Sequence, residues 1–243
     1  MARFFVDMPL TGGALLDLPE RVLRHVQVLR LREGETLTLF NGQGGEVAAT
    51  LTALGRREAR CLLGAHDPVS RESPIWLGLA QAISSGERMD FTLQKGVEMG
   101  VSVFQPLAAE RSVVKLAGER ADKRLARWQE IVVAACEQSG RTVVPRVLPI
   151  LSVEAWLAAS HDAAVKLLLS PLGSKRLADI AERPTSAWLM AGPEGGYTDV
   201  EERSALASGW TPLKLGPRVL RTETAALAAV AAIQTVWGDY ALS

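Results

Sequence analysis

Cysteine and long apolar runs are both scarce in this sequence. Its only cysteines, Cys61 and Cys136, lie far apart and form no CxxC pair. This argues against a disulfide framework or a structural zinc site and is typical of a reducing compartment. The longest apolar run, Ala225 to Ile233, is too short and too rich in alanine to span a bilayer. Because the first ten residues also lack the apolar core of a signal peptide, we expect a cytoplasmic protein without a metal site.

An excess of either charge is also missing. The chain has 27 lysines and arginines against 27 acidic residues, so its formal net charge is zero. A general nucleic-acid-binding protein usually carries a basic excess, so any positive surface for RNA must be local. Arginines do cluster between Arg21 and Arg32, between Arg56 and Arg60, and between Lys123 and Arg127. Each cluster taken alone is more often an ordinary solvated face.

The first part of the chain is predicted to be a small β-barrel. Polar and apolar residues alternate over 35–40, a glycine-rich turn follows at 41–45, and 46–51 resembles the returning strand of a hairpin. Residues 21–29 have the apolar spacing of a short helix. A segment with two prolines, 66–74, is typical of a linker. We therefore predict a first domain over residues 1–70 and a second over 71–243.

Strands and helices alternate in the second domain. Apolar segments predict strands at 75–83, 101–107, 165–169, 188–191 and 212–215. Helical spacing, caps and terminal glycines predict helices at 90–99, 120–139, 198–209 and 222–237. This alternation predicts an α/β fold with a parallel sheet covered on both faces.

Three glycine-containing loops follow apolar strands in this domain, at 170–173, 192–196 and 216–217. Ligands bind outside the carboxyl ends of strands in such sheets, and glycine lets the backbone approach a ligand closely. Each loop alone could be an ordinary turn, but three in series predict one site that recognises its ligand through backbone groups. Neither a dinucleotide fingerprint nor a P-loop is present, and the three histidines are scattered.

The segment Leu215-Gly-Pro-Arg-Val-Leu-Arg-Thr-Glu-Thr-Ala225 resembles the signature of the SPOUT superfamily of methyltransferases, which contain a trefoil knot. Gly192-Pro-Glu-Gly-Gly196 resembles the middle loop of that superfamily. More narrowly, nearly the whole chain resembles the 16S rRNA (uracil-N3) methyltransferase family. The segments that carry this resemblance are Arg3–Val6, His25–Gly34, Glu87–Gly100, Glu110–Lys115 and Arg127–Arg141. One departure is Gly96, where the family pattern predicts alanine.

The resemblance implies a PUA-like RNA-binding barrel followed by a trefoil-knotted methyltransferase domain. It implies S-adenosyl-L-methionine as methyl donor, N3 of a uridine in 16S rRNA of the small ribosomal subunit as acceptor, and a homodimer formed through the knot. The residues expected around the donor are Leu169, Met190, Gly192, Glu194, Gly195, Gly196, Leu215, Gly216, Leu220 and Thr224. Thr224 is equally well placed to cap the last helix.

Methylation at N3 requires that this atom lose its proton, so the site must favour an anionic base. Arg221 is our first candidate for stabilising the anion or for orienting a phosphate, and Arg218 is the second. Glu194 or Glu223 could accept the proton, although Glu223 could instead orient Arg221. Further candidates for phosphate contacts, together with Arg218, are Arg24, Arg30, Arg32, Lys95, Arg111 and Lys115.

Three other functions remain open from the sequence. A related knotted methyltransferase could modify another rRNA or tRNA position, including a ribose 2′-hydroxyl. A ribosome-assembly factor could retain the fold without activity, although intact glycine loops argue against such decay. A small-molecule enzyme has no catalytic constellation in its favour.

Overall fold

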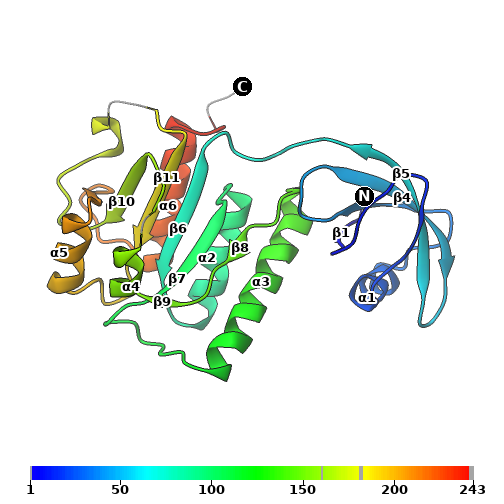
Figure 1. Ribbon diagram of the computed structural model, residues 1–243, viewed down its shortest axis with the longest axis horizontal. Coiled ribbons are helices and arrows are strands. Elements are labelled where there is room, and N and C mark those ends of the chain that lie inside the picture. The colour runs from blue at the N-terminus through cyan, green and yellow to red at the C-terminus, as the bar shows by residue number, and fades with distance from the viewer. Residues whose placement is uncertain (1, 160, 181–182, 241–243) are drawn as a thin grey trace. The chain divides into compact units, whose positions relative to one another are not determined.

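The computed structural model describes residues 2–159, 161–180 and 183–240, which form two compact units (Figure 1). One unit contains Met1–Glu72 together with Cys136–Val144, and the other contains Ser73–Ala135 and Pro145–Ser243. The grouping of residues 136–144 with the first unit has no signal in the sequence, because residues 136–139 continue the regular pattern of the helix predicted at 120–139.

The first unit is built around a five-stranded sheet and one short helix. The strand order is β1-β3-β4-β5-β2, and every pairing except the parallel β1–β3 pair is antiparallel. The hairpin predicted around residues 41–45 is confirmed as β3 and β4. The elements are β1 (Arg3–Phe5), β2 (Leu15–Asp17), α1 (Glu20–Val28), β3 (Thr36–Phe40), β4 (Glu46–Leu54) and β5 (Ala59–Asp67).

The second unit contains the predicted parallel sheet, with order β12-β10-β11-β6-β7-β8 and with β9 beside β7. All of its recorded pairings are parallel. The strands are β6 (Trp76–Ala82), β7 (Val103–Ala108), β8 (Arg146–Val147), β9 (Leu151–Ser152), β10 (Val165–Leu169), β11 (Ser186–Ala191) and β12 (Thr211–Leu213). The last strand is two residues shorter at its end than predicted, so 214–221 is a loop.

Helices cover both faces of this sheet (Figure 1). On one face α2 packs against α6, and on the other α4 and α5 pack over a core that includes alternate residues of β6 and β11. The helices are α2 (Gly86–Glu98), α3 (Glu119–Ser139), α4 (Val153–Ala158), α5 (Asp199–Ala207) and α6 (Thr222–Val236), with a 3-10 turn η1 (Leu177–Asp179). The cap predicted for the helix at 198–209 is confirmed as a capping box of Thr198 and Glu201. Helix α2 begins four residues before its predicted start. The trefoil knot itself stays a prediction.

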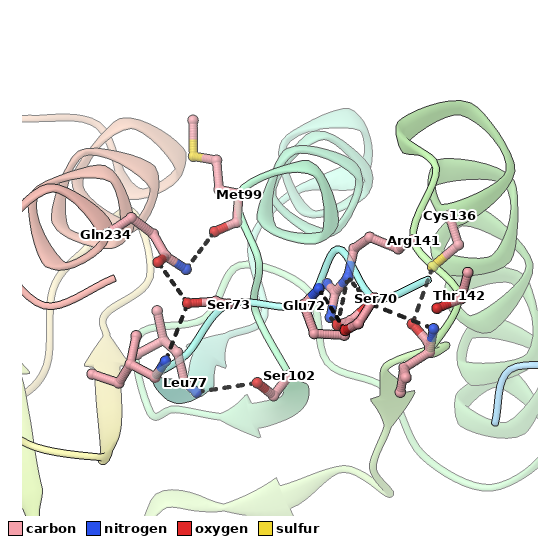
Figure 2. A network of polar contacts seen from close by, with 12 residues as sticks. Ser70, Glu72, Ser73, Leu77, Met99, Ser102, Cys136, Arg141, Thr142 and Gln234 are labelled. Carbon is pink, nitrogen blue, oxygen red and sulfur yellow. Dashed lines mark hydrogen bonds and ion pairs between the residues drawn. The ribbon is translucent and has the colours of Figure 1, made fainter. Parts of the chain in front are cut away.

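Buried polar side chains fix the backbone within each unit (Figure 2). In the first unit, Arg141 is almost fully buried and its Nε donates to Glu72 Oε2 at 3.0 Å. In the second unit, the fully buried Gln234 of α6 accepts from Ser73 Oγ at 2.7 Å and donates to the carbonyl of Met99 at 2.8 Å. The second group therefore joins the start of this unit to the end of α2 and to the last helix.

At Gly96, where the family pattern predicts alanine, Phe104 occupies the space that a side chain would need. A Cβ at position 96 would lie 2.8 Å from Cε1 of the fully buried Phe104. Helix propensity alone favours alanine by about 1 kcal/mol, but overpacking a core costs about 1–3 kcal/mol. We therefore expect Gly96→Ala to lower the free energy of unfolding in urea rather than raise it. The cost should vanish in a Phe104→Leu background, and stabilisation by the single change would contradict this account.

His161 packs within a tryptophan cluster that makes the stability of this unit sensitive to pH. Its ring centroid lies 3.5 Å from that of Trp156, and Nε2 lies 2.6 Å from the Trp156 carbonyl oxygen. Burial lowers the pKa of His161, although the Trp156 carbonyl opposes this shift.

The unfolded chain therefore takes up a proton near the ordinary histidine pKa of about 6.5, whereas the folded protein does so only at lower pH. Stability is lost as pH falls from this value toward the folded pKa. We expect urea midpoints measured between pH 7.5 and 5 to fall more steeply for the wild type than for His161→Phe. Parallel curves would contradict this.

Candidate functional site

A cavity in the described residues lies where the sequence predicted a site. It has a volume of about 550 Å³ and opens at the carboxyl ends of β10, β11 and β12, whose last residues Leu169, Ala191 and Leu213 line it. All three glycine-containing loops contribute to its wall. This volume is within the usual range for pockets that bind a small molecule or cofactor.

The loop after β11 is shaped by close packing and by a buried tyrosine. A Cβ at Gly192 would lie 3.3 Å from the Tyr197 ring, and the Tyr197 hydroxyl donates to the Ala191 carbonyl at 2.9 Å. Burial raises the pKa of Tyr197 well above its ordinary value, so this hydroxyl keeps its proton and remains a donor. Gly196 has φ of +68°, and Gly216 in the next loop has φ of +87°. These conformations favour glycine over any other residue.

Most residues expected around a ligand do line the cavity. They are Leu169, Gly192, Glu194, Gly195, Gly196, Leu215, Gly216 and Leu220. Two of the predicted residues do not. Met190 is fully buried in the hydrophobic core, because alternate residues of β11 face α4 and α5. Thr224 is exposed on the first turn of α6 and does not cap that helix, whose N-cap is Arg221.

Glu194 is held in place from two sides. Its Oε1 accepts from the Ser85 backbone amide at 2.9 Å and from Arg88 Nη1 at 3.1 Å. Burial raises the pKa of Glu194, but hydrogen bonds from Ser85, from the backbone amide of Glu194 itself and from Arg88 together outweigh it and leave the pKa below its ordinary value. Glu194 is therefore a carboxylate at neutral pH and a weakened proton acceptor. It lies at the N-terminal end of α2, where a negative charge is favourable.

Arg88 is a cavity residue that the sequence did not single out. It lines the wall and lies between two carboxylates, with Nη1 3.1 Å from Glu194 and Nε 3.9 Å from Glu223. Glu223 is not among the residues that line the cavity. Its second carboxylate oxygen is buried without a hydrogen-bond partner. The only feature of the sequence that could have pointed to Arg88 as a site residue is its position inside the motif Glu87–Gly100.

Arg218 and Arg221 line the cavity from the loop between β12 and α6, and both are exposed. No hydrogen bond or ion pair is recorded for either guanidinium group, in contrast to Arg88. The donors of both guanidinium groups are therefore available to a ligand. Arg218 was predicted as an RNA contact, and it lines the same cavity as Arg221.

The other predicted phosphate contacts differ in how far they are already engaged. Arg111 donates to the carbonyls of Gly195 and Tyr197, at 3.3 and 3.2 Å, and so supports the loop after β11. Lys115 donates to the carbonyls of residues 109 and 110, and Lys95 pairs with Glu98 at 2.8 Å. In the first unit Arg24 pairs with Glu20 on an exposed face, whereas Arg30 and Arg32 are exposed without an ion pair.

Two classes of feature are not found in the part of the chain that the structure describes. No group of three or more His, Cys, Asp or Glu residues there could hold a metal ion. No described helix is long and apolar enough to cross a membrane.

Comparisons with known proteins identify the family. The RNA methyltransferase domain model matches residues 71–234, and the RNA methyltransferase PUA domain model matches residues 18–63. Ribosomal RNA small subunit methyltransferase E of Bacillus subtilis (strain 168) is 32% identical over 247 residues, which cover 96% of each chain.

Two solved structures match over nearly their full length. Ribosomal RNA small subunit methyltransferase E from Neisseria gonorrhoeae, bound to S-adenosyl methionine, has 48% identity and a TM-score of 0.94 over 99% of each chain. A Legionella pneumophila protein in complex with the same cofactor has 39% identity and a TM-score of 0.94 over 98% of each chain. The α/β fold that the sequence predicted is thereby confirmed, and the chain belongs to the RNA methyltransferase family and carries that family's PUA domain.

Proposed function

We propose that this protein transfers a methyl group from S-adenosyl-L-methionine to N3 of one uridine in 16S rRNA of the small ribosomal subunit. Family membership supports RNA methylation, and the names of the relatives support the small-subunit rRNA. The observation that carries the proposal is the cavity in which three glycine loops meet two exposed arginines. The choice of N3 rests on the resemblance of nearly the whole chain to the uracil-N3 family.

The cavity suits the methyl donor in size and chemistry. Leu169, Leu215 and Leu220 offer apolar surface for a purine, while the loop backbones offer hydrogen-bonding groups for its edge and for the ribose. When bound, the donor supplies a methyl group on a positively charged sulfur. The chain itself orients the donor and leaves one side of the cavity open to an RNA base.

Arg221 and Arg218 supply positive charge to the base during the reaction. Uridine becomes a nucleophile at N3 only after its N3–H proton passes to water, and the resulting negative charge spreads onto its carbonyl oxygens. Guanidinium donors that are already in place stabilise such a charge as it develops. We assign Glu194 and Glu223 to holding Arg88 rather than to accepting the proton, because Glu194 has a lowered pKa and Glu223 lies outside the cavity wall.

We further propose that Arg24, Arg30 and Arg32 of the PUA unit contact RNA phosphates. Arg30 supports this most strongly because it is exposed and has φ of +56°, the only positive φ outside glycine among the described residues. It follows α1, and the hydrogen bonds of Arg30 N to Gln27 O and Leu31 N to Val26 O form a Schellman motif. Glycine is the usual residue at this position.

We expect Arg30→Gly to stabilise the protein while weakening RNA binding. Relief of the left-handed conformation raises the free energy of unfolding by about 1–2 kcal/mol. The greater freedom of glycine in the unfolded chain lowers it again by about 0.5–1 kcal/mol. The slope of log K against log salt should become shallower by about 0.7–0.9 for one lost phosphate contact. Urea unfolding and a salt titration of RNA binding measure the two effects, and an unchanged salt slope would remove Arg30 from the RNA interface.

The resemblance also implies a homodimer in the cytoplasm. The exposed Val236 at the C-terminal end of α6 and the exposed Tyr240, four residues beyond it, support a contact surface there. Light scattering of the purified protein tests this, and a monomer at micromolar concentration would contradict it.

The decisive test of the function is methyl transfer from labelled S-adenosylmethionine to small subunits from a strain that lacks this gene. We expect 3-methyluridine at one position in 16S rRNA when the modified nucleoside is mapped. Label on a ribose or on another base would retain RNA methylation but reject N3. Donor binding without transfer to any small-subunit RNA would favour an inactive assembly factor.

A further inference from the structure

A glutamine is buried within the apolar sheet, in contact with two residues of the cavity wall. Gln81 lies near the end of β6, is 1% exposed and pairs in register with Ala191 of β11. Its Nε2 lies 2.9 Å from Thr222 Oγ1, 3.5 Å from the Gly192 carbonyl oxygen and 3.0 Å from the Ala82 carbonyl oxygen. A polar side chain in a buried parallel strand is unusual and needs such partners.

The direction of each hydrogen bond follows from the partners. The carbonyls of Gly192 and Ala82 can only accept, so the amide nitrogen of Gln81 must face them. Thr222 Oγ1 lies 2.5 Å from the Gly192 carbonyl oxygen and has a single hydrogen, which it donates there. Thr222 therefore accepts from Gln81, and the bonds form a chain from Gln81 through Thr222 to Gly192. Hydrogen bonds in such a chain strengthen one another.

This chain joins two of the three loops that form the cavity. Gly192 opens the loop after β11, whereas Thr222 is the first residue of α6 and ends the loop that carries Arg218 and Arg221. Both residues line the cavity, and Gln81 does not. The carbonyl of Gly192 accepts a hydrogen bond from Thr222 within the protein.

We propose that Gln81 is a positioning residue that sets the affinity for the methyl donor through Thr222 and the Gly192 carbonyl. The inference rests on the proposed function, since it takes the cavity to be the donor site. Gln81 touches neither the donor nor the RNA. It fixes the orientation of the 192–193 peptide relative to the start of α6, so the two loops present one preformed surface to the donor.

The second polar atom of Gln81 indicates that this position is not optimised for stability alone. Oε1 is buried and has no hydrogen-bond partner. An unpaired buried acceptor costs about 1–3 kcal/mol, which an apolar side chain of similar shape would avoid. An apolar residue could fill this space without the cost of an unpaired acceptor. A glutamine that serves through its amide N–H groups cannot avoid that cost, because Oε1 comes with them.

The chain offers a matched control in Gln105 on the neighbouring strand β7. Gln105 is 2% exposed, and its Nε2 donates to the carbonyls of Pro106 and Pro149 at 2.9 and 2.7 Å. It is thus a second buried glutamine of the same sheet, with the same bond to the following carbonyl. Neither of its partners lines the cavity.

The test is calorimetric titration of S-adenosylmethionine into the full chain without RNA, with thermal unfolding of each variant in parallel. We expect Gln81→Met to raise the donor Kd about tenfold, equivalent to about 1.4 kcal/mol, with little change in Tm. Gln105→Met should lower Tm and leave the Kd unchanged. Thr222→Val should weaken donor binding at least as much as Gln81→Met, and the double variant should be no weaker than Thr222→Val alone.

Each result decides the proposal. Wild-type affinity of Gln81→Met, or equal loss of affinity in Gln105→Met, would overturn it. The proposal would also be overturned if the losses of donor affinity in Gln81→Met and Thr222→Val multiplied in the double variant, because the two residues would then act independently. If Gln81→Met does not fold, wild-type affinity of Thr222→Val still overturns it. Failure of the wild type to bind the donor would instead reject the proposed function, whereas a different methylated position in the RNA would leave these binding results unaffected.

Discussion

Replacing Arg221 with alanine is expected to reduce methyl transfer at least about a hundredfold while changing the donor Kd by less than about threefold. Removal of one preorganised donor to a developing negative charge typically costs a factor of about 10²–10³ in rate. The guanidinium of Arg221 is exposed at the cavity wall and no ion pair is recorded for it, so its loss leaves no buried charge unpaired. Single-turnover rates with saturating RNA and donor titrations measure the two quantities.

Two further variants test whether the guanidinium group of Arg221 is responsible for the expected loss of rate. Arg221→Lys keeps the charge but loses the planar fork of donors, so we expect an intermediate rate. Arg120→Ala removes an exposed arginine at the start of α3 and should leave both quantities unchanged. If Arg221 stabilises the uracil anion, the deficit of the alanine variant should shrink as pH rises and the base loses its proton in solution. Normal turnover by a folded Arg221→Ala protein would reject the role.

Replacing Gly216 with valine is expected to weaken donor binding about tenfold or more. Gly216 has φ of +87° and lies in the cavity wall, where a Cβ meets no neighbouring atom within 4 Å. The obstacle is therefore conformational rather than steric. A β-branched residue destabilises this backbone conformation by at least about 1–2 kcal/mol, so the loop leaves it and must be restored when the donor binds.

Gly209 provides the matched control for this substitution. It has φ of +80° directly after α5 and does not line the cavity. Gly209→Val should therefore lower Tm by an amount similar to Gly216→Val and leave the donor Kd unchanged. Equal donor affinities for the two variants would show that the conformation at Gly216 is not needed for binding.

The elements of the second unit could be predicted well because their signals are local. Apolar strands such as Leu167–Leu169, the capping box at Thr198 and the terminal glycines Gly100 and Gly209 each act within a few residues of the chain. The convergence of three glycine loops also followed from the sequence, because the carboxyl ends of parallel strands meet at one edge of a sheet.

The side-chain details of the site could not be predicted because they depend on contacts between distant segments. Arg88 became recognisable only when the structure placed it between Glu194 and Glu223, which are about a hundred residues or more away in sequence. Thr222 rather than Thr224 faces the Gly192 loop because of the rotation of the first turn of α6. Gln81 lay unnoticed inside an apolar strand because its partners belong to two other loops.

The two parts of the cavity wall differ in how freely they can change during evolution. The glycine loops form their part largely from main chain, and substitution of most neighbouring side chains leaves main-chain groups where they are. The rim is formed by exposed side chains such as those of Arg218, Val219 and Arg221. Single substitutions there alter charge and shape without disturbing the loops beneath. A lineage with this architecture can therefore acquire a new RNA target while its use of the methyl donor is inherited unchanged.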